Sequence, residues 1–353
     1  MKVSVVGAGA IGSMLGGLIK HHHPEVDVML IVRGEHGRAM NERRAVQLDG
    51  PWGTREVSIN TSFSMADIAG SDYVLITVKS HACEGAIESA DPHLGDAIVI
   101  SIQNGINDEV LARVVADERL VMGMTATNMA ILEPGAVSLQ LDGTTVVGPA
   151  SHRKNVDAAH DAAELLRKTG LQIDEHPNVL GVQYNKLAIN ALGYASCLSA
   201  SNFITEAICN RGWRTHVGVG ILDECIQAYN LAGIELAKIP GRPDVNKLRR
   251  FLGLLDVPIA GTVVALGAKQ FYNKKPIVFS LYQDLLRGKM TEVDFINGEI
   301  VRLAAANGSE APCNALAVEM VHELEKRGDA SFFQREEVIE RFRGLQLAVA
   351  ETV

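Results

Sequence analysis

Residues 2–12 read KVSVVGAGAIG, and this stretch decides the fold. A short β-rich run leads directly into the pattern G-x-G-x-x-G, formed by Gly7, Gly9 and Gly12. Between a strand and a helix, that pattern is the phosphate loop of a dinucleotide-binding βαβ unit. Gly7 permits the tight turn, Gly9 lets the backbone approach a pyrophosphate, and Gly12 lets helix and strand pack closely.

The helix that follows the loop supplies the rest of the predicted phosphate site. The first N–H groups of a helix have no partner within it, and the positive end of the helix dipole lies beside them. Ala10 and Ile11 occupy these positions in the sequence. We therefore predict that the cofactor-binding loop consists of Gly7, Gly9, Ala10, Ile11 and Gly12.

The residue after the second predicted strand indicates which dinucleotide binds. NAD-binding forms usually carry a carboxylate there for the ribose hydroxyls, whereas a guanidinium pairs with a 2′-phosphate. Residues 26–32 form that strand and Arg33 follows it, with Arg38 as a second candidate cation. Arg33 therefore favours NADPH. The alternative is an ordinary solvated arginine, and the nearby Glu35 weakens the inference slightly.

β-rich runs alternate with helical patterns through the first half of the chain. The strand candidates are residues 2–7, 26–32, 73–78, 97–102, 120–125, 136–141 and 144–148. The helix candidates are residues 10–21, 35–43, 81–90, 107–116 and 152–169. This alternation predicts an α/β Rossmann domain with a mostly parallel sheet covered by helices.

The sequence pattern changes after the polar, proline-containing segment 175–178. Beyond it strand-like runs disappear and long helical patterns follow. We predict an NADP-binding domain over 1–177 and an all-α substrate and catalytic domain over 178–353, as expected for a chain too long for one core. One predicted helix starts with Thr291 as its N-cap and runs to Ala306, and another spans 313–327. The tail 329–353 is expected to be partly helical.

Composition excludes several classes of protein. The net charge of -9 argues against nucleic acid and anionic membranes as partners. The five cysteines are scattered without metal-ligand or disulfide spacing, which predicts reduced thiols, a cytoplasmic location and no metal site. The N-terminus runs straight into a strand, so no signal peptide is expected. The sequence contains no run of about 18 apolar residues, so no membrane span is expected.

Polar residues at three further places are candidates for chemistry. Lys79 and Asn104 follow two predicted strands, and ligands of open α/β sheets lie beyond such strand ends. Lys186 and Asn190 are four residues apart, so they share one face of a predicted helix with apolar residues between them. A lysine beside buried apolar residues is costly unless it is paired or used. The alternative for Lys79 and Asn104 is that they are ordinary loop residues. The alternative for Lys186 is a lysine at a helix start whose ammonium group reaches the solvent.

These segments resemble the ketopantoate reductases (2-dehydropantoate 2-reductases) in the same order over roughly residues 1–325. The matching stretches are GAGAIG, VRG, TVKS, QNG and NKLAIN, followed by SLYQD at 280–284 and TEVDFING at 291–298. The last two together are far more specific than the glycine loop. The resemblance implies NADPH-dependent reduction of a 2-keto acid to a 2-hydroxy acid, with ketopantoate and pantothenate biosynthesis as the first candidate.

The resemblance also implies roles for individual residues. Lys186 matches the lysine that protonates the developing alkoxide, and Glu292 matches the carboxylate that binds and orients the substrate. The remaining matches are Ser280 for the substrate carboxylate, Asn190 for the substrate hydroxyl, Asn104 near nicotinamide and substrate, and Lys79 on the cofactor side. An ammonium group can stabilise and protonate an alkoxide, provided that burial lowers its pKa from about 10.4.

One departure from the family pattern concerns the substrate. Family members usually carry a second asparagine two turns beyond the lysine, where this chain has Tyr194. Tyr194 therefore becomes a substrate-binding candidate, and a bulkier 2-keto acid is an alternative, as in dehydrogenases of the D-mandelate type. A non-catalytic NADP-binding sensor is the alternative from another class. A homodimer through the helical half is an option that no sequence pattern tests.

Overall fold

The computed structural model describes residues 1–150, 155–241, 243–255, 267, 279–329 and 331–352. The chain divides into two compact units, one of which is mixed α/β and the other helical. The first comprises Met1–Gln183 with Ile239–Arg242, and the second comprises Tyr184–Lys238 with Pro243–Val353. The boundary expected at 177/178 coincides with the start of a long helix, whereas the structural division falls inside that helix.

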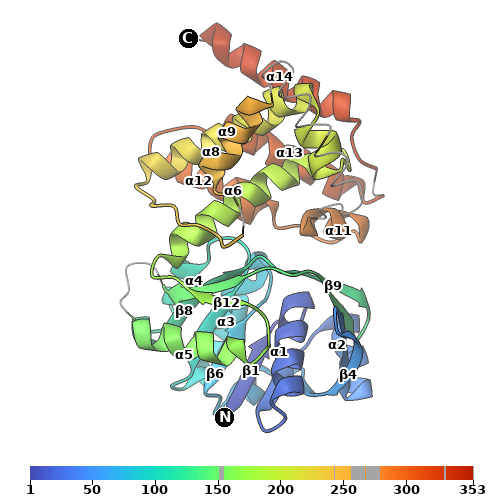
Figure 1. Ribbon diagram of the computed structural model, residues 1–353, viewed down its shortest axis with the longest axis vertical. Coiled ribbons are helices and arrows are strands. Elements are labelled where there is room, and N and C mark those ends of the chain that lie inside the picture. Colours follow the sequence, from blue (N-terminus) through green and yellow to red (C-terminus); the bar gives the residue numbers. More distant parts are fainter. Residues whose placement is uncertain (151–154, 242, 256–266, 268–278, 330, 353) are drawn as a thin grey trace. The chain divides into compact units, whose positions relative to one another are not determined.

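The first unit is built on an eight-stranded sheet in the order β12-β11-β8-β7-β6-β1-β2-β5 (Figure 1). The strands are β1 (Lys2–Val6), β2 (Asp27–Ile31), β5 (Asn60–Ser62), β6 (Tyr73–Ile76), β7 (Ile98–Ile102), β8 (Leu120–Thr125), β11 (Thr145–Pro149) and β12 (Ile173–Glu175). Every neighbouring pair is parallel except β8 with β11. The predicted Rossmann domain with a mostly parallel sheet is confirmed.

Hydrophobic cores on the two faces of this sheet explain its buried strands. One core joins the sheet to α1 (Ala10–His22), α2 (Gly34–Arg43) and α5 (Val156–Arg167). The other joins it to α3 (Cys83–Leu94) and α4 (Asp108–Ala112). Alternate residues of each strand point to opposite cores, so strands such as β1 and β6 are apolar on both faces. Short 3₁₀ helices complete the unit at Met65–Ile68, Ser80–Ala82 and Asp117–Arg119.

A second, four-stranded sheet in the order β4-β3-β10-β9 was not predicted from the sequence. It consists of β3 (Ala45–Gly50), β4 (Gly53–Ser58), β9 (Asn128–Glu133) and β10 (Ala136–Leu141). Helix α1 packs closely on it, because a Cβ at Gly17 would lie 2.9 Å from Leu48 Cδ2. In β4 only Val57 is buried, so the strand lacks the alternation that marks a half-buried strand.

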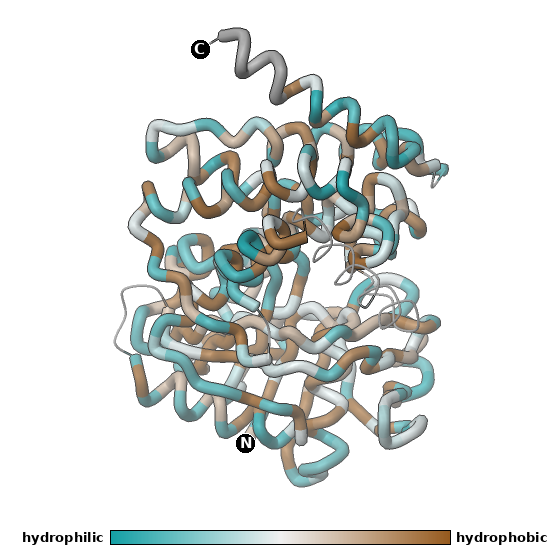
Figure 2. The backbone as a smooth tube through the Cα atoms, turned by 45° about the horizontal axis from the view of Figure 1, so that its top comes forward, coloured by the Kyte–Doolittle hydropathy of each residue, from teal (hydrophilic) through white to brown (hydrophobic). Residues whose placement is uncertain are grey.

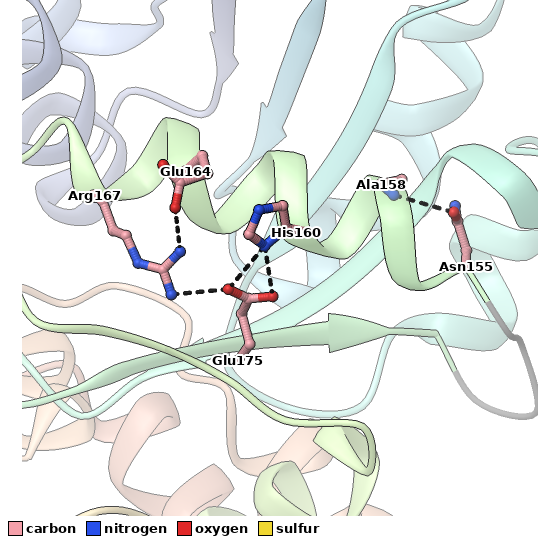
Figure 3. Close-up of polar contacts among 6 residues, drawn as sticks. All are labelled: Asn155, Ala158, His160, Glu164, Arg167 and Glu175. Carbon is pink, nitrogen blue, oxygen red and sulfur yellow. Dashed lines mark hydrogen bonds and ion pairs between the residues drawn. The ribbon is translucent and has the colours of Figure 1, made fainter.

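Polar contacts fix the ends of α5 and join it to β12 (Figure 3). The Asn155 side chain accepts from the Ala158 N–H at 3.2 Å, which is why the helix starts at Val156. Arg167 contacts the Glu175 carboxylate at 2.8 Å, and His160 contacts it at 3.2 Å. Burial raises the pKa of Glu175, but the hydrogen bonds from Arg167 and His160 outweigh it and lower the pKa overall.

The described residues of the second unit form helices and connecting loops without any strand, as the sequence predicted. Its helices are α6 (Val179–Cys197), α7 (Arg211–Trp213), α8 (Val219–Leu231), α9 (Val245–Leu254), α11 (Ser280–Leu286), α12 (Val293–Ala306), α13 (Pro312–Arg327) and α14 (Arg335–Thr352), with π-helical turns at Phe203–Ile208 and Arg214–Gly218. Hydrophilic and hydrophobic residues alternate along the described turns of α14 (Figure 2). Val338 and Phe342 are fully buried and one turn apart, so this helix is amphipathic.

The start of α12 corrects one prediction. Thr291 is not the N-cap, because the helix begins at Val293 and Glu292 occupies the cap position without a side-chain cap bond. The Thr291 hydroxyl instead accepts from the Val293 N–H at 3.3 Å, and the Thr291 N–H donates to Glu325 at 2.8 Å. Tertiary contact therefore moves the boundary by one residue. The helix ends at Ala306 as predicted.

Glu224 of α8 caps the N-terminus of α13 from a neighbouring helix. Its carboxylate accepts from the backbone N–H groups of Cys313 at 2.7 Å and Asn314 at 2.9 Å, and from the Asn314 side chain at 2.7 Å. The preceding Ala311 offers no side-chain cap, and Pro312 has no N–H. The carboxylate therefore supplies the acceptor that α13 lacks locally and joins α8 to α13.

Replacing Glu224 with alanine should destabilise the second unit. The change leaves buried N–H groups of α13 without their acceptor, which costs about 1–3 kcal/mol in the free energy of unfolding. Urea unfolding followed by circular dichroism measures this cost. The exposed Glu319, on the solvent side of α13 itself, is the control, and Glu319→Ala should change stability by less than about 0.5 kcal/mol. Equal effects of the two substitutions would contradict the capping role.

Candidate active site

The glycine loop lies at the carboxyl end of β1, next to the end of β6. Gly7 has φ +99°, and a Cβ there would lie 2.5 Å from the Val78 backbone nitrogen. A Cβ at Gly12 would lie 2.5 Å from Thr77 Oγ1. Neither position can hold a side chain without moving the backbone or its neighbours. Gly7 and Gly12 are therefore glycine because β1, α1 and β6 meet here.

Gly9 is glycine for a different reason. Its φ is -83°, which any residue adopts, and the nearest atom to an added Cβ is the Gly7 carbonyl oxygen at 4.0 Å. The fold leaves room for a side chain here, but the space lies over the start of α1, where a phosphate would sit. Gly9 is the N-cap without a side-chain cap bond, and the first turn, with Ala10 and Ile11, contains no acidic residue. These features fit a pyrophosphate.

The end of β2 is tied to this loop. The Ala8 N–H donates to the Ile31 carbonyl at 3.3 Å, so the glycine loop contacts the strand that leads to Arg33. Arg33 is exposed and extended at the N-cap of α2, and Gly34 follows it with φ +64°. The structure therefore places Arg33, with an exposed side chain, at the same sheet edge as the glycine loop.

The ends of β6 and β7 are also held together. Ser80 Oγ donates to the Asn104 carbonyl at 2.7 Å, and Gln103 Nε2 donates to the Val78 carbonyl at 2.9 Å. Lys79 and Asn104 are both half-buried on these connected loops. One edge of the sheet therefore carries the glycine loop, Arg33, Lys79 and Asn104. Ligands of open α/β folds bind at this edge, beyond the carboxyl ends of the strands.

The helical unit contains a second group of predicted residues, centred on Lys186 of α6. Burial lowers the pKa of Lys186 from its ordinary value of 10.5 to about 8, and the negative charge of Glu292 opposes that shift. Glu292 is only 3% exposed, at the start of α12. Two residues 106 positions apart thus lie within electrostatic reach of each other. An ammonium group with a pKa of about 8 is protonated at neutral pH and gives up its proton more readily than an ordinary lysine, so it is suited to proton donation.

Tyr194 joins the same group from α6, two turns beyond Lys186. Its hydroxyl lies 3.1 Å from Ser280 Oγ, the first residue of α11, and its side chain is 1% exposed. Burial is the largest cause that raises the pKa of Tyr194 well above its ordinary value, and the charges of Glu292 and Asp284 add to it. Tyr194 is therefore a neutral phenol that can donate or accept a hydrogen bond. Asn190 is half-buried on the turn between Lys186 and Tyr194.

Sequence reasoning missed the residue that anchors this turn of α6. Asn185 is fully buried, and its side chain donates to the Ala237 carbonyl at 3.1 Å and accepts from the Val245 N–H at 2.8 Å. Asn185, directly before Lys186, therefore holds the middle of the segment between α8 and α9 and the first residue of α9. The only sequence signal was an amide inside an apolar helix, which does not reveal its distant backbone partners.

Other chemistries find little support among the described residues. The part of the chain that the structure describes contains no group of three or more histidine, cysteine or acidic side chains placed to hold a metal ion. All five cysteines are free thiols, and burial raises the pKa of Cys83 and of Cys197. Within the same described part of the chain, no helix is long and apolar enough to cross a bilayer.

The fold and the two residue groups define a two-domain oxidoreductase with a dinucleotide-binding domain and a helical domain, and comparison with known proteins agrees. Residues 3–152 match the family described as "Ketopantoate reductase PanE/ApbA", and residues 178–325 match its C-terminal domain. The chain belongs to the ketopantoate reductase family. It is therefore a pyridine-nucleotide-dependent oxidoreductase acting on a CH–OH group.

Individual relatives show the same agreement over most of the chain. The 2-dehydropantoate 2-reductase of Pyrococcus horikoshii is 29% identical over 94% of this chain and 100% of its own length. The Geobacter metallireducens 2-dehydropantoate 2-reductase structure has a TM-score of 0.74 at 20% identity, covering 92% of this chain and 99% of its own. D-mandelate dehydrogenase with NADH and anilino(oxo)acetate has a TM-score of 0.74 at 22% identity, covering 93% and 100%. The two structures show likeness of fold.

Substitutions in the glycine loop should separate folding from cofactor binding. Gly9→Ala should leave the melting temperature unchanged, since its Cβ meets open space, yet weaken NADPH binding on the order of tenfold or more because it fills the phosphate position. Gly7→Ala should instead lower the melting temperature, because it clashes with the Val78 backbone. Thermal unfolding and fluorescence titration with NADPH measure the two effects. A fully functional Gly9→Ala variant would contradict the phosphate site.

The lowered pKa of Lys186 predicts the pH dependence of reduction. The lysine must be protonated to donate, so kcat/KM should fall as pH rises through about 8. Glu292→Gln removes the charge that holds this pKa up, so the fall should begin at lower pH. Initial rates across pH 6–10 with saturating cofactor measure both profiles. If the profile of Glu292→Gln moved to higher pH, the assigned electrostatics would be wrong.

Proposed function

We propose that this protein reduces a small 2-keto acid to the 2-hydroxy acid with NADPH, and that 2-dehydropantoate is the first candidate substrate. The observation that carries the proposal is Lys186, whose pKa is lowered to about 8 and which lies within electrostatic reach of the buried Glu292. Relatives that match at least nine tenths of the chain are named 2-dehydropantoate 2-reductase, which supports the same reaction.

The proposed chemistry divides between cofactor and protein. NADPH, when bound, supplies the hydride that adds to the keto carbon. Negative charge then develops on the keto oxygen, where the Lys186 ammonium stabilises it and gives up a proton to form the hydroxyl group. Glu292 keeps Lys186 protonated near neutral pH by its charge and also binds substrate. Ser280 and Tyr194 offer hydroxyl groups to the substrate carboxylate, with Asn190 and Asn104 as amide contacts.

The proposed choice of NADPH as cofactor rests on the positively charged residues at the carboxyl edge of the sheet. The Arg33 guanidinium is exposed beside the glycine loop and pairs with the 2′-phosphate of NADPH, and Lys79 adds a positive charge two strands away. The loop from Gly7 to Gly12 holds the pyrophosphate. These residues fit a phosphorylated dinucleotide without any metal ion.

Tyr194 favours a second candidate substrate. Its buried phenol replaces a short amide, which changes the shape and polarity of the substrate site. Sites that hydrogen-bond a substrate hydroxyl discriminate strongly against analogues without one. A 2-keto acid with an aromatic or apolar side chain, such as benzoylformate, is therefore the alternative to ketopantoate. The D-mandelate dehydrogenase structure carries anilino(oxo)acetate, an acid of this kind.

Location and assembly belong to the same proposal. Five free cysteines support a reducing compartment, and hence the cytoplasm. The substrate is a small molecule, and neither nucleic acid nor membrane is a partner in this proposal. A homodimer stays a prediction without structural support.

A panel of 2-keto acids tests the function directly. The protein should oxidise NADPH with ketopantoate or benzoylformate, and the better substrate decides between the two candidates. Lys186→Ala should lower kcat by about 100-fold or more with NADPH affinity within twofold of the original. Absorbance of NADPH and fluorescence titration measure the two quantities.

The exposed Lys289 provides the matched control, and Lys289→Ala should leave kcat unchanged. If no acid consumed NADPH despite tight binding, the reductase proposal would fail and a sensor would be the better interpretation. Unaltered turnover in Lys186→Ala would refute the assigned acid alone.

A further inference from the structure

His36, in the first turn of α2, joins three segments of the first unit. Its Nδ1 accepts a hydrogen bond from the Gly135 N–H at 3.0 Å, in the turn between β9 and β10. Its Nε2 lies 3.2 Å from Oγ of Ser13, a fully buried residue in α1. The imidazole is therefore held from both sides, three residues beyond Arg33.

The direction of these hydrogen bonds follows from the donors. A backbone N–H can only donate, so Nδ1 of His36 carries no proton and the neutral ring carries its proton on Nε2. Nε2–H therefore donates to Ser13 Oγ, whose own hydroxyl proton is directed to the Ala8 carbonyl at 3.1 Å. The result is one continuous chain of hydrogen bonds from Gly135 through His36 and Ser13 to the glycine loop. Such chains strengthen each member.

Ala8 is where this chain meets the cofactor edge. Its carbonyl accepts from Ser13, and its N–H donates to Ile31 at the end of β2. His36 thus fastens the α2 turn that carries Arg33 to the loop that binds the pyrophosphate. The backbone there is close-packed as well, because a Cβ at Gly37 would lie 2.7 Å from Val32 Cβ.

We propose that His36 is a positioning residue that sets the distance between Arg33 and the glycine loop, and thereby the preference for a 2′-phosphorylated adenine nucleotide. A guanidinium reads a 2′-phosphate only at a fixed separation from the pyrophosphate site, because the ribose joins the two groups rigidly. The proposal rests on the proposed function only in taking NADPH as the cofactor. In this proposal His36 acts through Arg33 and the glycine loop.

Substitutions can remove the two hydrogen bonds of His36 one at a time. The side-chain oxygen of asparagine replaces Nδ1, so His36→Asn keeps the Gly135 bond and loses Ser13. The amide nitrogen of glutamine replaces Nε2, so His36→Gln keeps Ser13 and loses Gly135. Ser13→Ala breaks the chain from the other side, and His36→Ala removes both bonds.

Adenosine 2′,5′-bisphosphate and 5′-AMP are the probes, and calorimetry of the full-length protein gives their affinities without any turnover. His36→Ala, His36→Asn and Ser13→Ala should each weaken the bisphosphate about five- to tenfold, with 5′-AMP within twofold. His36→Gln should restore most of the preference. The double variant Ser13→Ala/His36→Ala should lose no more than either single variant, because both interrupt one chain.

Two further variants complete the comparison. Arg33→Ala should abolish the preference for the bisphosphate over 5′-AMP. The affinity lost in this variant gives the largest effect that any of the other variants can reach. His160→Ala removes a histidine that bridges α5 and β12 elsewhere on the same sheet, and it should leave the preference intact (Figure 3). Equal weakening of both nucleotides, or a preference that survives in His36→Asn and Ser13→Ala, would overturn the role of His36. If the unaltered protein bound both nucleotides equally, the NADPH assignment itself would fail.

Discussion

The close approach of β1, α1 and β6 at the glycine loop is the constraint on which the first unit depends. Gly7 and Gly12 let backbone and helix meet at distances that no side chain allows, and Thr77 Oγ1 donates to the Gly7 carbonyl at 2.8 Å to hold the meeting point. Strand order reverses between β1 and β6, so the loop lies at the switch point of the sheet. The position that needs no glycine for folding, Gly9, is the one left for a ligand.

In the helical unit the main constraint is the partial burial of a charge, the Lys186 ammonium group. Lys186 loses hydration on α6, and a lone buried ammonium would be costly, but Glu292 at the start of α12 compensates part of that cost. The balance leaves the pKa of Lys186 at about 8. Asn185 and Tyr194 on the same helix are buried and hydrogen-bonded to other segments, so the helix that carries the lysine has little freedom to move.

Local patterns made much of this architecture predictable. The strand, glycine loop and helix at the N-terminus, and the two-sided apolar strands β6 and β7, carry their signals within a few residues. The second sheet was missed because β4 buries one residue and has no period to detect. The N-cap of α12 was misplaced by one residue because Glu325 holds Thr291 from another helix. Distant partners override local preference wherever a boundary depends on them.

The sequence by itself determined the class of both units and the identity of the charged residues, because strand periodicity, glycine spacing and residue type are local properties. Only the tertiary structure decided that Lys186 and Glu292 share one electrostatic environment, that Tyr194 meets Ser280, and that His36 connects Ser13 with the β9–β10 turn. Electrostatic coupling and hydrogen bonding act over a few ångströms of space, and separation along the chain does not encode that distance.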